Sequence, residues 1–337
     1  MLLEGYIGEV GREIKVGGEC GVGGVALLDG SSRKTMSVLA KILYYLRTVL
    51  AVLVLSGCGL YGVVASIFCT LIGKQHLSQW TTARSFYYAM KLVLGLDVKV
   101  IGEENMPKKP FIMIANHQST LDIFMLGRIF PPGCTVTAKK SMKYLPFLGW
   151  FMTLSGTYFL DRSSRQQAVE TLNRGLENVK KNKRALWVFP EGTRSYTTEL
   201  TMLPFKKGAF HLAQQGHIPI VPVVVSNTST LTNPKYGVFN RGCMIVKILE
   251  PFSTENLTKD KVGEFSEQVR TRMIDTLKEI GYSPAINDTT LPPEALKYAT
   301  LQQEKRKNAI KNGAVSSVGA NEDVSVHHEG SSAKRMH

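Results

Sequence analysis

The chain has 337 residues, of which 44% are hydrophobic, and a formal net charge of +14 at pH 7. This length accommodates one domain of about 200 to 250 residues with additional segments, and the charge favours an anionic partner such as nucleic acid, an acidic lipid surface or a phosphorylated substrate. No motif of a nucleic-acid-binding fold follows, so we expect no nucleic-acid partner. The five cysteines are scattered without zinc-ligand spacing, so we expect no metal site.

The N-terminal part of the chain divides into an extension and a predicted membrane anchor. Residues 1–35 are polar, rich in glycine and without a sustained period, which predicts a flexible extension. Residues 49–73 contain no charged residue; about 20 apolar residues suffice for a transmembrane helix, although a buried core helix is an alternative. Residues 80–96 repeat apolar and aromatic groups at helical spacing, typical of either core packing or an interfacial helix. Residues 36–96 are therefore predicted to form an anchor followed by an amphipathic helix.

Short apolar runs alternate with helical patterns through residues 97–290, which predicts a single α/β domain around a largely buried sheet. The predicted strands are 98–102, 111–115, 135–138, 185–189, 220–225 and 244–249, and the predicted helices are 119–130, 165–180, 208–215 and 261–281. Residues 291–337 are polar and low in aromatic residues, so we expect a disordered tail.

A candidate acid–base pair follows the second predicted strand. His117 and Asp122 lie five residues apart, and Ser119 could cap the helix that follows. Asp122 would then occupy the third helical position, from which a side chain points back over the cap. The carboxylate could simply complete a capping box. Alternatively, it could reach Nδ1 of the imidazole and leave Nε2 free to act as a base. The local pattern leaves both interpretations open.

Two further clusters each place an arginine shortly after an apolar run. They are Gly156–Arg162 (GTYFLDR) and Phe189–Arg194 (FPEGTR). A guanidinium group in such a place can form paired hydrogen bonds to a phosphate, and Gly192 allows the backbone to approach a ligand closely. A fourth cluster, Ile218–Val223 (IPIVPV), contains prolines that are suited to shaping the entrance of a strand.

These four clusters, in this order and at these spacings, resemble the motifs of the glycerolipid acyltransferase family, whose H-x4-D signature His117 and Asp122 match. The resemblance covers about residues 36–290 and is closest to the fungal 1-acyl-sn-glycerol-3-phosphate acyltransferases. It implies a mixed, largely buried sheet flanked by helices, with an N-terminal transmembrane helix. It also implies transfer of an acyl group from acyl-CoA to the sn-2 hydroxyl of lysophosphatidic acid. The product would be phosphatidic acid, a precursor of phospholipids and triacylglycerol.

The resemblance also implies a role for individual residues. His117 would take the proton of the attacking hydroxyl and Asp122 would orient the imidazole; Arg162, Glu191, Gly192, Thr193 and Arg194 would bind the glycerol phosphate. Because a thioester is already activated, no covalent nucleophile is required, and no cofactor is expected beyond the co-substrate acyl-CoA.

Three related expectations concern the acceptor, the partners and the location. Another lysophospholipid or glycerol-3-phosphate is the alternative acceptor. An esterase would more often carry a G-x-S-x-G elbow, which this sequence lacks. The expected partners are acyl-CoA, lysophosphatidic acid and membrane lipids, with no protein partner. The expected location is the endoplasmic reticulum membrane, and also the lipid droplet.

Overall fold

The computed structural model describes residues 38–161, 165–286 and 291–311, so the extension predicted for 1–35 lies outside the described residues. The chain divides into two compact units after Ala295. The α-helices of the first unit are α2 (Val38–Leu71), α3 (Ser78–Leu94), α4 (Asp122–Ile129), α5 (Leu148–Leu154), α6 (Arg165–Lys181), α7 (Gly208–Gly216) and α8 (Val262–Ile280). Its strands are β1 (Leu96–Ile101), β2 (Phe111–Ala115), β3 (Cys134–Lys139), β4 (Tyr158–Leu160), β5 (Ala185–Val188), β6 (Ile220–Val225), β7 (Thr232–Asn233), β8 (Val238–Phe239) and β9 (Gly242–Ile248).

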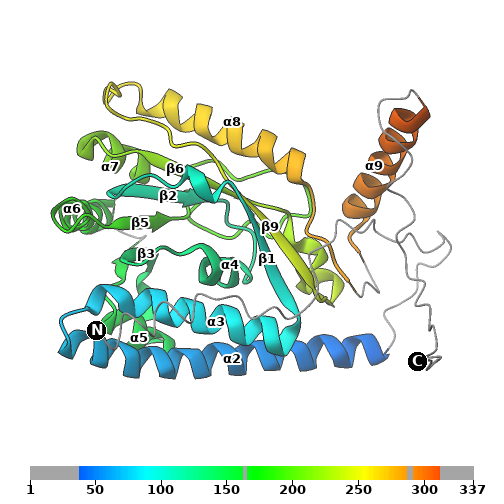
Figure 1. Cartoon of the computed structure of the whole chain (residues 1–337), viewed down its shortest axis with the longest axis horizontal. Helices are drawn as coiled ribbons and strands as arrows, with labels where there is room; N and C mark the ends of the chain where they lie inside the picture. Colours follow the sequence, from blue (N-terminus) through cyan, green and yellow to red (C-terminus); the bar gives the residue numbers. More distant parts are fainter. Residues whose placement is uncertain (1–37, 162–164, 287–290, 312–337) are drawn as a thin grey trace, which may run out of the picture. The chain divides into compact units, whose positions relative to one another are not determined.

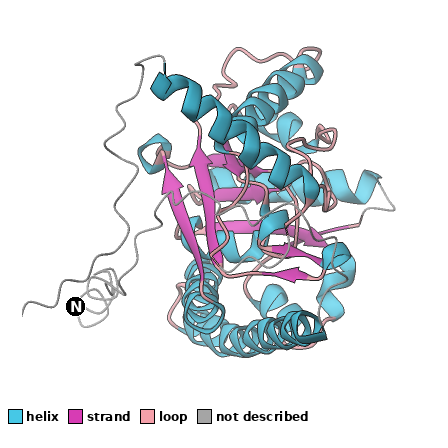
Figure 2. Cartoon of the chain, turned by 90° about the vertical axis from the view of Figure 1, so that its right-hand side faces the viewer, coloured by secondary structure: helices cyan, strands magenta, loops and turns pink. Residues whose placement is uncertain are grey.

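Seven strands form one mixed sheet in the order β1-β9-β6-β2-β5-β3-β4. The strands from β6 to β4 are parallel to one another. Strand β9 is antiparallel to β6 and parallel to β1. Helices α6, α7 and α8 cover one face of this sheet, while α3 and α4 lie on the other with α2 and α5 beyond them (Figures 1 and 2). The mixed sheet flanked by helices that the sequence predicted is therefore confirmed.

Strand β2 is the middle strand of the sheet. His117 and Asp122 follow its carboxyl end, so the candidate pair lies beside the central strands. Phe111, Met113 and Ala115 pack into the apolar core shared with α3 and α4, whereas Ile112 and Ile114 pack into the core shared with α7 and α8. This alternation follows from the two-residue period of a strand, since a strand buried on both faces needs apolar side chains throughout. The turn that follows Ala115 consequently emerges between the ends of β5 and β6.

The six predicted strands are all present, and their ends differ from the predicted ones by at most two residues. Strand β4 was not predicted, because three residues after Gly156 are too few to show a period. The helix predicted from Ser119 begins instead at Asp122. The hydroxyl of Ser119 accepts a hydrogen bond from the backbone N–H of Leu121 at 3.1 Å, which holds residues 119–121 in a separate turn.

Helix α2 is long and apolar enough to cross a membrane, over Ala40–Leu71, and only 17% of its most apolar window is buried. It nevertheless packs against α3 and α5. A Cβ atom at Gly62 would lie 2.6 Å from the ring of Phe151, so only glycine allows this approach. Near the other end of the helix, the buried Arg47 donates a hydrogen bond to the carbonyl oxygen of Leu94 at 2.6 Å.

Helix α3 covers most of the segment 80–96, for which the sequence left core packing and an interfacial helix open, and the structure shows core packing on one face. Its side chains Phe86, Tyr87 and Met90 are buried in the core, so one face serves core packing, while Leu92 on the outer face is 85% exposed.

Helix α9 (Pro293–Lys311) occupies part of the segment for which the sequence predicted disorder. Proline is favoured at the first position of a helix, because its missing N–H would have no partner there. The alanine, leucine, glutamine and lysine residues that follow have high helix propensity. The predicted tail therefore begins with a helix.

Candidate active site

The turn after β2 is fixed to the end of β6 by side-chain amides. The side chain of Asn116 donates to the carbonyl oxygen of Val225 at 2.9 Å and accepts from the N–H of Val225 at 2.8 Å. Gln118 donates to the same carbonyl at 3.0 Å and accepts from the N–H of Thr228 at 3.0 Å. Each of these four residues is at most 4% exposed. The hydrogen bonds therefore form away from water and hold the turn in one conformation.

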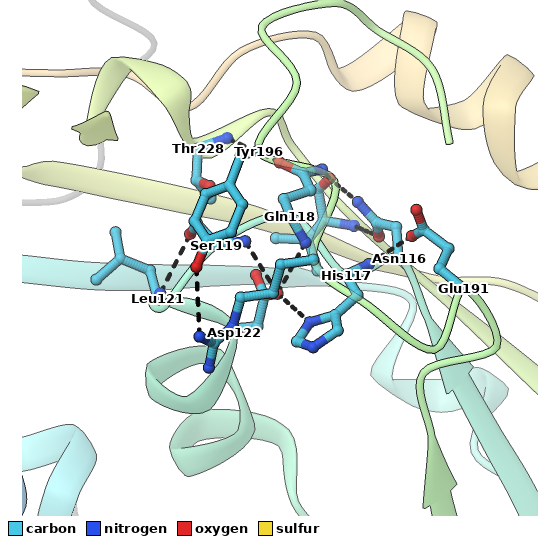
Figure 3. Close-up of polar contacts among 11 residues, drawn as sticks. Asn116, His117, Gln118, Ser119, Leu121, Asp122, Glu191, Tyr196 and Thr228 are labelled. Atoms are coloured by element: carbon cyan, nitrogen blue, oxygen red, sulfur yellow. Dashed lines mark hydrogen bonds and ion pairs between the residues drawn. The ribbon is translucent and has the colours of Figure 1, made fainter. Parts of the chain in front are cut away.

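His117 and Asp122 form a hydrogen-bonded pair (Figure 3). Nδ1 of His117 lies 2.6 Å from Oδ2 of Asp122. The same oxygen accepts from the N–H groups of Gln118 at 2.8 Å and Ser119 at 3.1 Å. A carboxylate can only accept, so Nδ1 carries the proton and Nε2 keeps a free lone pair. Asp122 thus contacts both the local backbone N–H groups and Nδ1 of the imidazole, so the contact that the second interpretation requires is present. The role of Nε2 as a base stays a prediction.

The ring of His117 is also fixed by stacking. Its centroid lies 4.2 Å from that of Phe189, with 17° between the ring planes. Asp122 is fully buried, whereas the His117 side chain keeps 15% of its surface accessible. The imidazole is therefore held from one side by the carboxylate and from one face by the phenyl ring, and it remains accessible at the cavity described below.

Glu191, which follows the end of β5, holds the turn through hydrogen bonds of its carboxyl group. Its Oε1 accepts from the backbone N–H of His117 at 2.6 Å, and its Oε2 accepts from the N–H of Leu203 at 2.9 Å. Burial raises the pKa of the Glu191 carboxyl to about 7, although the two N–H groups act in the opposite direction. Because both oxygens contact backbone N–H groups, the geometry gives Glu191 a positioning role. A direct role in binding glycerol phosphate stays a prediction.

The remaining residues of the predicted substrate site lie beside Glu191. Gly192 has a φ of +70°, and a Cβ atom there would lie 2.8 Å from the side chain of Lys206. Thr193 is exposed. Arg194 donates to the hydroxyl of Tyr196 at 3.4 Å. Arg162 lies outside the described residues, so its predicted role is not addressed by the structure.

A cavity of about 750 Å³ opens beside His117, and its lining contains two chemically different sets of side chains. We define the apolar wall by side chains from four helices, and the cationic wall by four basic residues. The apolar wall comprises Leu55 and Cys58 of α2, Phe86 of α3, Leu126 of α4, and Phe151 and Met152 of α5. The cationic wall comprises Lys139, Arg194, Lys206 and Lys207. His117 therefore lies in a space that can take an apolar chain and an anionic group at the same time.

Of the four residues of the cationic wall, only Arg194 was predicted from the sequence. Lys139 ends strand β3, and Lys206 and Lys207 directly precede helix α7. The only sequence signal for these lysines was a basic residue at the end of a strand or before a helix. Many basic residues occupy such positions, so the signal does not single them out without the fold. Among residues 38–161, 165–286 and 291–311, no group of three or more histidine, cysteine, aspartate or glutamate side chains could hold a metal ion.

Known proteins share this architecture. A family model described as Acyltransferase matches residues 97–226. The 1-acyl-sn-glycerol-3-phosphate acyltransferase of Saccharomyces cerevisiae is 79% identical over 303 residues, which cover 90% of this chain and 100% of that protein. The human 1-acyl-sn-glycerol-3-phosphate acyltransferase alpha is 33% identical over 65% of this chain and 76% of its own length. The crystal structure of the 1-acyl-sn-glycerophosphate acyltransferase PlsC from Thermotoga maritima superimposes with a TM-score of 0.58 and 27% identity, covering 71% of this chain and 98% of that one.

Proposed function

This chain belongs to the acyltransferase family that includes the 1-acyl-sn-glycerol-3-phosphate acyltransferases, and on that premise we propose its reaction. The acyl group of acyl-CoA is transferred to the sn-2 hydroxyl of 1-acyl-sn-glycerol-3-phosphate. The products are phosphatidic acid, for phospholipid and triacylglycerol synthesis, and free coenzyme A. The observation that carries the proposal is the position of the His117–Asp122 pair in one cavity with an apolar wall and a cationic wall.

The pair supplies general acid–base catalysis. Nε2 of His117 accepts the proton of the sn-2 hydroxyl as its oxygen forms a bond to the thioester carbonyl carbon. Asp122 holds Nδ1–H at 2.6 Å and stabilises the imidazolium that results. When the tetrahedral intermediate collapses, the carbon–sulfur bond breaks, and the imidazolium returns its proton to the thiolate of coenzyme A. The proton of the hydroxyl thus leaves on the thiol of coenzyme A, and the proposed reaction uses no cofactor beyond the co-substrate acyl-CoA.

The two walls account for the acceptor. A lysophosphatidic acid carries an acyl chain and a phosphate on one glycerol, so that the chain can lie against the apolar wall and the phosphate against the cationic wall. Arg194 is suited to paired hydrogen bonds with phosphate oxygens. Glycerol-3-phosphate has no acyl chain of its own, so with that acceptor only the chain of acyl-CoA could lie against the apolar wall. A lysophospholipid with a larger headgroup is the second candidate, because it too carries a chain and a phosphate.

Purified full-length protein should be incubated with labelled acyl-CoA and a panel of acceptors in mixed micelles. The panel comprises lysophosphatidic acid, lysophosphatidylinositol, lysophosphatidylcholine and glycerol-3-phosphate, with the His117→Ala variant as the background control. The proposal expects the highest kcat/KM with lysophosphatidic acid. A higher value with any other acceptor would replace it.

We also propose that the protein works in the endoplasmic reticulum membrane and on lipid droplets. The apolar helix α2 supports an attachment to membranes. Imaging a tagged chain beside markers of both compartments tests this location. Exclusion from both would overturn it.

A further inference from the structure

The starts of the central parallel strands lie at the edge of the sheet opposite the catalytic turn, and they carry basic residues. His117 and Glu191 follow the ends of β2 and β5. Lys109 lies two residues before β2, and Arg184 directly precedes β5. Parallel strands start at one edge, and five residues at about 3.3 Å each separate that edge from the catalytic one by about 17 Å. These cations are therefore not part of the active site.

The connection between α2 and α3 adds two more basic groups at the same edge. Lys74 and His76 lie in and beside the short 3-10 helix Gln75–Leu77. A Cβ atom on Gly133, which precedes β3, would lie 3.8 Å from the His76 ring and 3.8 Å from Nζ of Lys109. Lys74, His76, Lys109 and Arg184, which we call the strand-start cluster, thus converge from three parts of the sequence.

The strand-start cluster is not neutralised by carboxylates of the described chain. Among residues 38–161, 165–286 and 291–311, none of its four members takes part in an ion pair. Burial lowers the pKa of His76, and the charged groups that lower it further are Arg184, Lys109 and Lys74, all of them cations. A concentration of positive charge that the protein leaves uncompensated favours an anionic ligand from outside.

An exposed apolar face of α2 leads directly to this cluster. Leu60, Val64, Ile67 and Leu71 are spaced by four, three and four residues, so they lie on one side of the helix, and each is at least 50% exposed. The helix ends at Leu71, and Lys74 follows three residues later. An apolar helix face bordered by basic residues is the pattern of a segment whose hydrophobic side enters lipid while its cations meet the headgroups.

We propose that the strand-start cluster binds the phosphate groups of anionic phospholipids at the surface of the membrane that takes up the exposed face of α2. Apolar contact alone does not distinguish one lipid from another. The cluster adds a preference for acidic lipid and fixes the end of α2 at headgroup level. The inference is independent of the proposed reaction, because it uses neither the catalytic pair nor the cavity.

Two variants with the same loss of charge test the proposal. The cluster variant combines Lys74→Gln, Lys109→Gln and Arg184→Gln. The control variant combines Lys259→Gln, Lys261→Gln and Arg272→Gln, in and beside α8, which covers the face of the sheet away from α2 (Figure 1). Each full-length protein, purified in neutral detergent, is mixed with vesicles of phosphatidylcholine alone or with about 30% phosphatidylglycerol, and bound protein is measured by flotation.

A basic residue near an acidic membrane surface increases partition by about five-fold, so three residues together account for about 100-fold. We expect the wild type and the control variant to prefer the acidic vesicles by a similar factor, and the cluster variant to lose most of that preference. Binding to neutral vesicles should be the same for all three proteins, and equal acyltransferase turnover in detergent verifies that each is folded. A preference that survives in the cluster variant, or is lost equally in the control, overturns the proposal. As a further measurement, raising the salt concentration should abolish the preference of the wild type; a salt-independent preference would also contradict it.

Discussion

The turn that carries His117 is held by hydrogen bonds to backbone groups, whereas the cations that line the same cavity make few contacts with the protein. Oδ2 of Asp122 accepts three hydrogen bonds, and Glu191 accepts one from the backbone of His117. Within the described chain Arg194 makes one hydrogen bond, at 3.4 Å, and the side chain of Lys206 is exposed. The difference indicates that the groups performing the chemistry are set before the substrate arrives, while the groups receiving its phosphate complete their contacts only with substrate.

We expect the largest loss of activity when the imidazole of His117, which the turn holds in place before substrate binds, is removed. His117→Ala should lower kcat by about two to four orders of magnitude, the usual range for a lost general base. His211→Ala is the matched control, because a second histidine lines the same cavity without belonging to the pair. Turnover is measured at saturating concentrations of both substrates. Near-normal turnover in His117→Ala, or an equal loss in His211→Ala, would end the assignment.

The buried carboxyl group of Glu191 should make the stability of the protein depend on pH. The pKa of Glu191 is raised to about 7 in the folded protein, so the folded state binds a proton that an unfolded glutamate releases at its lower, ordinary pKa. The resulting contribution is fully present below the ordinary carboxyl range and is lost as the pH rises through about 7. The free energy of unfolding should therefore fall between mildly acidic and mildly basic pH, by up to about 3 kcal/mol.

Thermal unfolding of the wild type and Glu191→Gln across that pH range measures this contribution. Glutamine cannot titrate, and its amide nitrogen would face a backbone N–H, so the variant should be less stable while losing much of the pH dependence. Parallel pH profiles for the two proteins would exclude Glu191 as the titrating group.

Arg194 represents the cationic wall, and its removal should affect one substrate only. Arg194→Lys keeps the charge but loses the paired geometry. A lost charge-assisted contact costs about 1.5 to 3 kcal/mol, or about ten- to hundred-fold in kcat/KM for the acceptor. Steady-state kinetics in which each substrate is varied in turn should show an unchanged KM for acyl-CoA. Unaltered acceptor kinetics would remove Arg194 from the phosphate site.

The smallest expected effect distinguishes two neighbouring lysines. The side chain of Lys206 lies against Gly192, whereas Nζ of Lys207 lies 2.9 Å from the position of a Cβ atom on Gly263, near the start of α8. Lys206→Met should lower kcat/KM for the acceptor about five-fold, since a solvent-accessible charge contributes about 1 kcal/mol or less. Lys207→Met should change it little. Equal effects would mean that general surface charge, rather than placement at Gly192, matters.

The sequence was most informative where one element determines the outcome. The short apolar run Phe111–Ala115 predicted β2 with the bounds that the structure shows, and the spacing of His117 and Asp122 allowed their contact because both lie close to one short turn. It was less informative at the ends of elements. Helix α4 begins at Asp122 because the Ser119 hydroxyl binds the N–H of Leu121, and propensity alone does not encode that contact.

Contacts between distant segments were beyond prediction from the sequence. Glu191 accepts hydrogen bonds from the N–H groups of His117 and Leu203, which lie far apart in the chain. The sequence motif predicted a substrate-binding role for Glu191 and gave no sign of these contacts. Lys206 reaches the active site only because the segment after Arg194 returns to Gly192. Such contacts depend on how loops fold over the sheet, which no local period records.

In the proposed mechanism, the charge of Asp122, held on a rigid turn, makes His117 a base. Asp122→Asn tests it most directly, because Oδ1 of Asp122 has no hydrogen-bond partner within the described chain, so an asparagine can place its amide oxygen where Oδ2 lies. We expect kcat to fall at least about 100-fold while the free energy of unfolding changes by about 1 kcal/mol or less. Retained turnover, with or without a loss of stability, would show that Asp122 serves only to cap the local backbone.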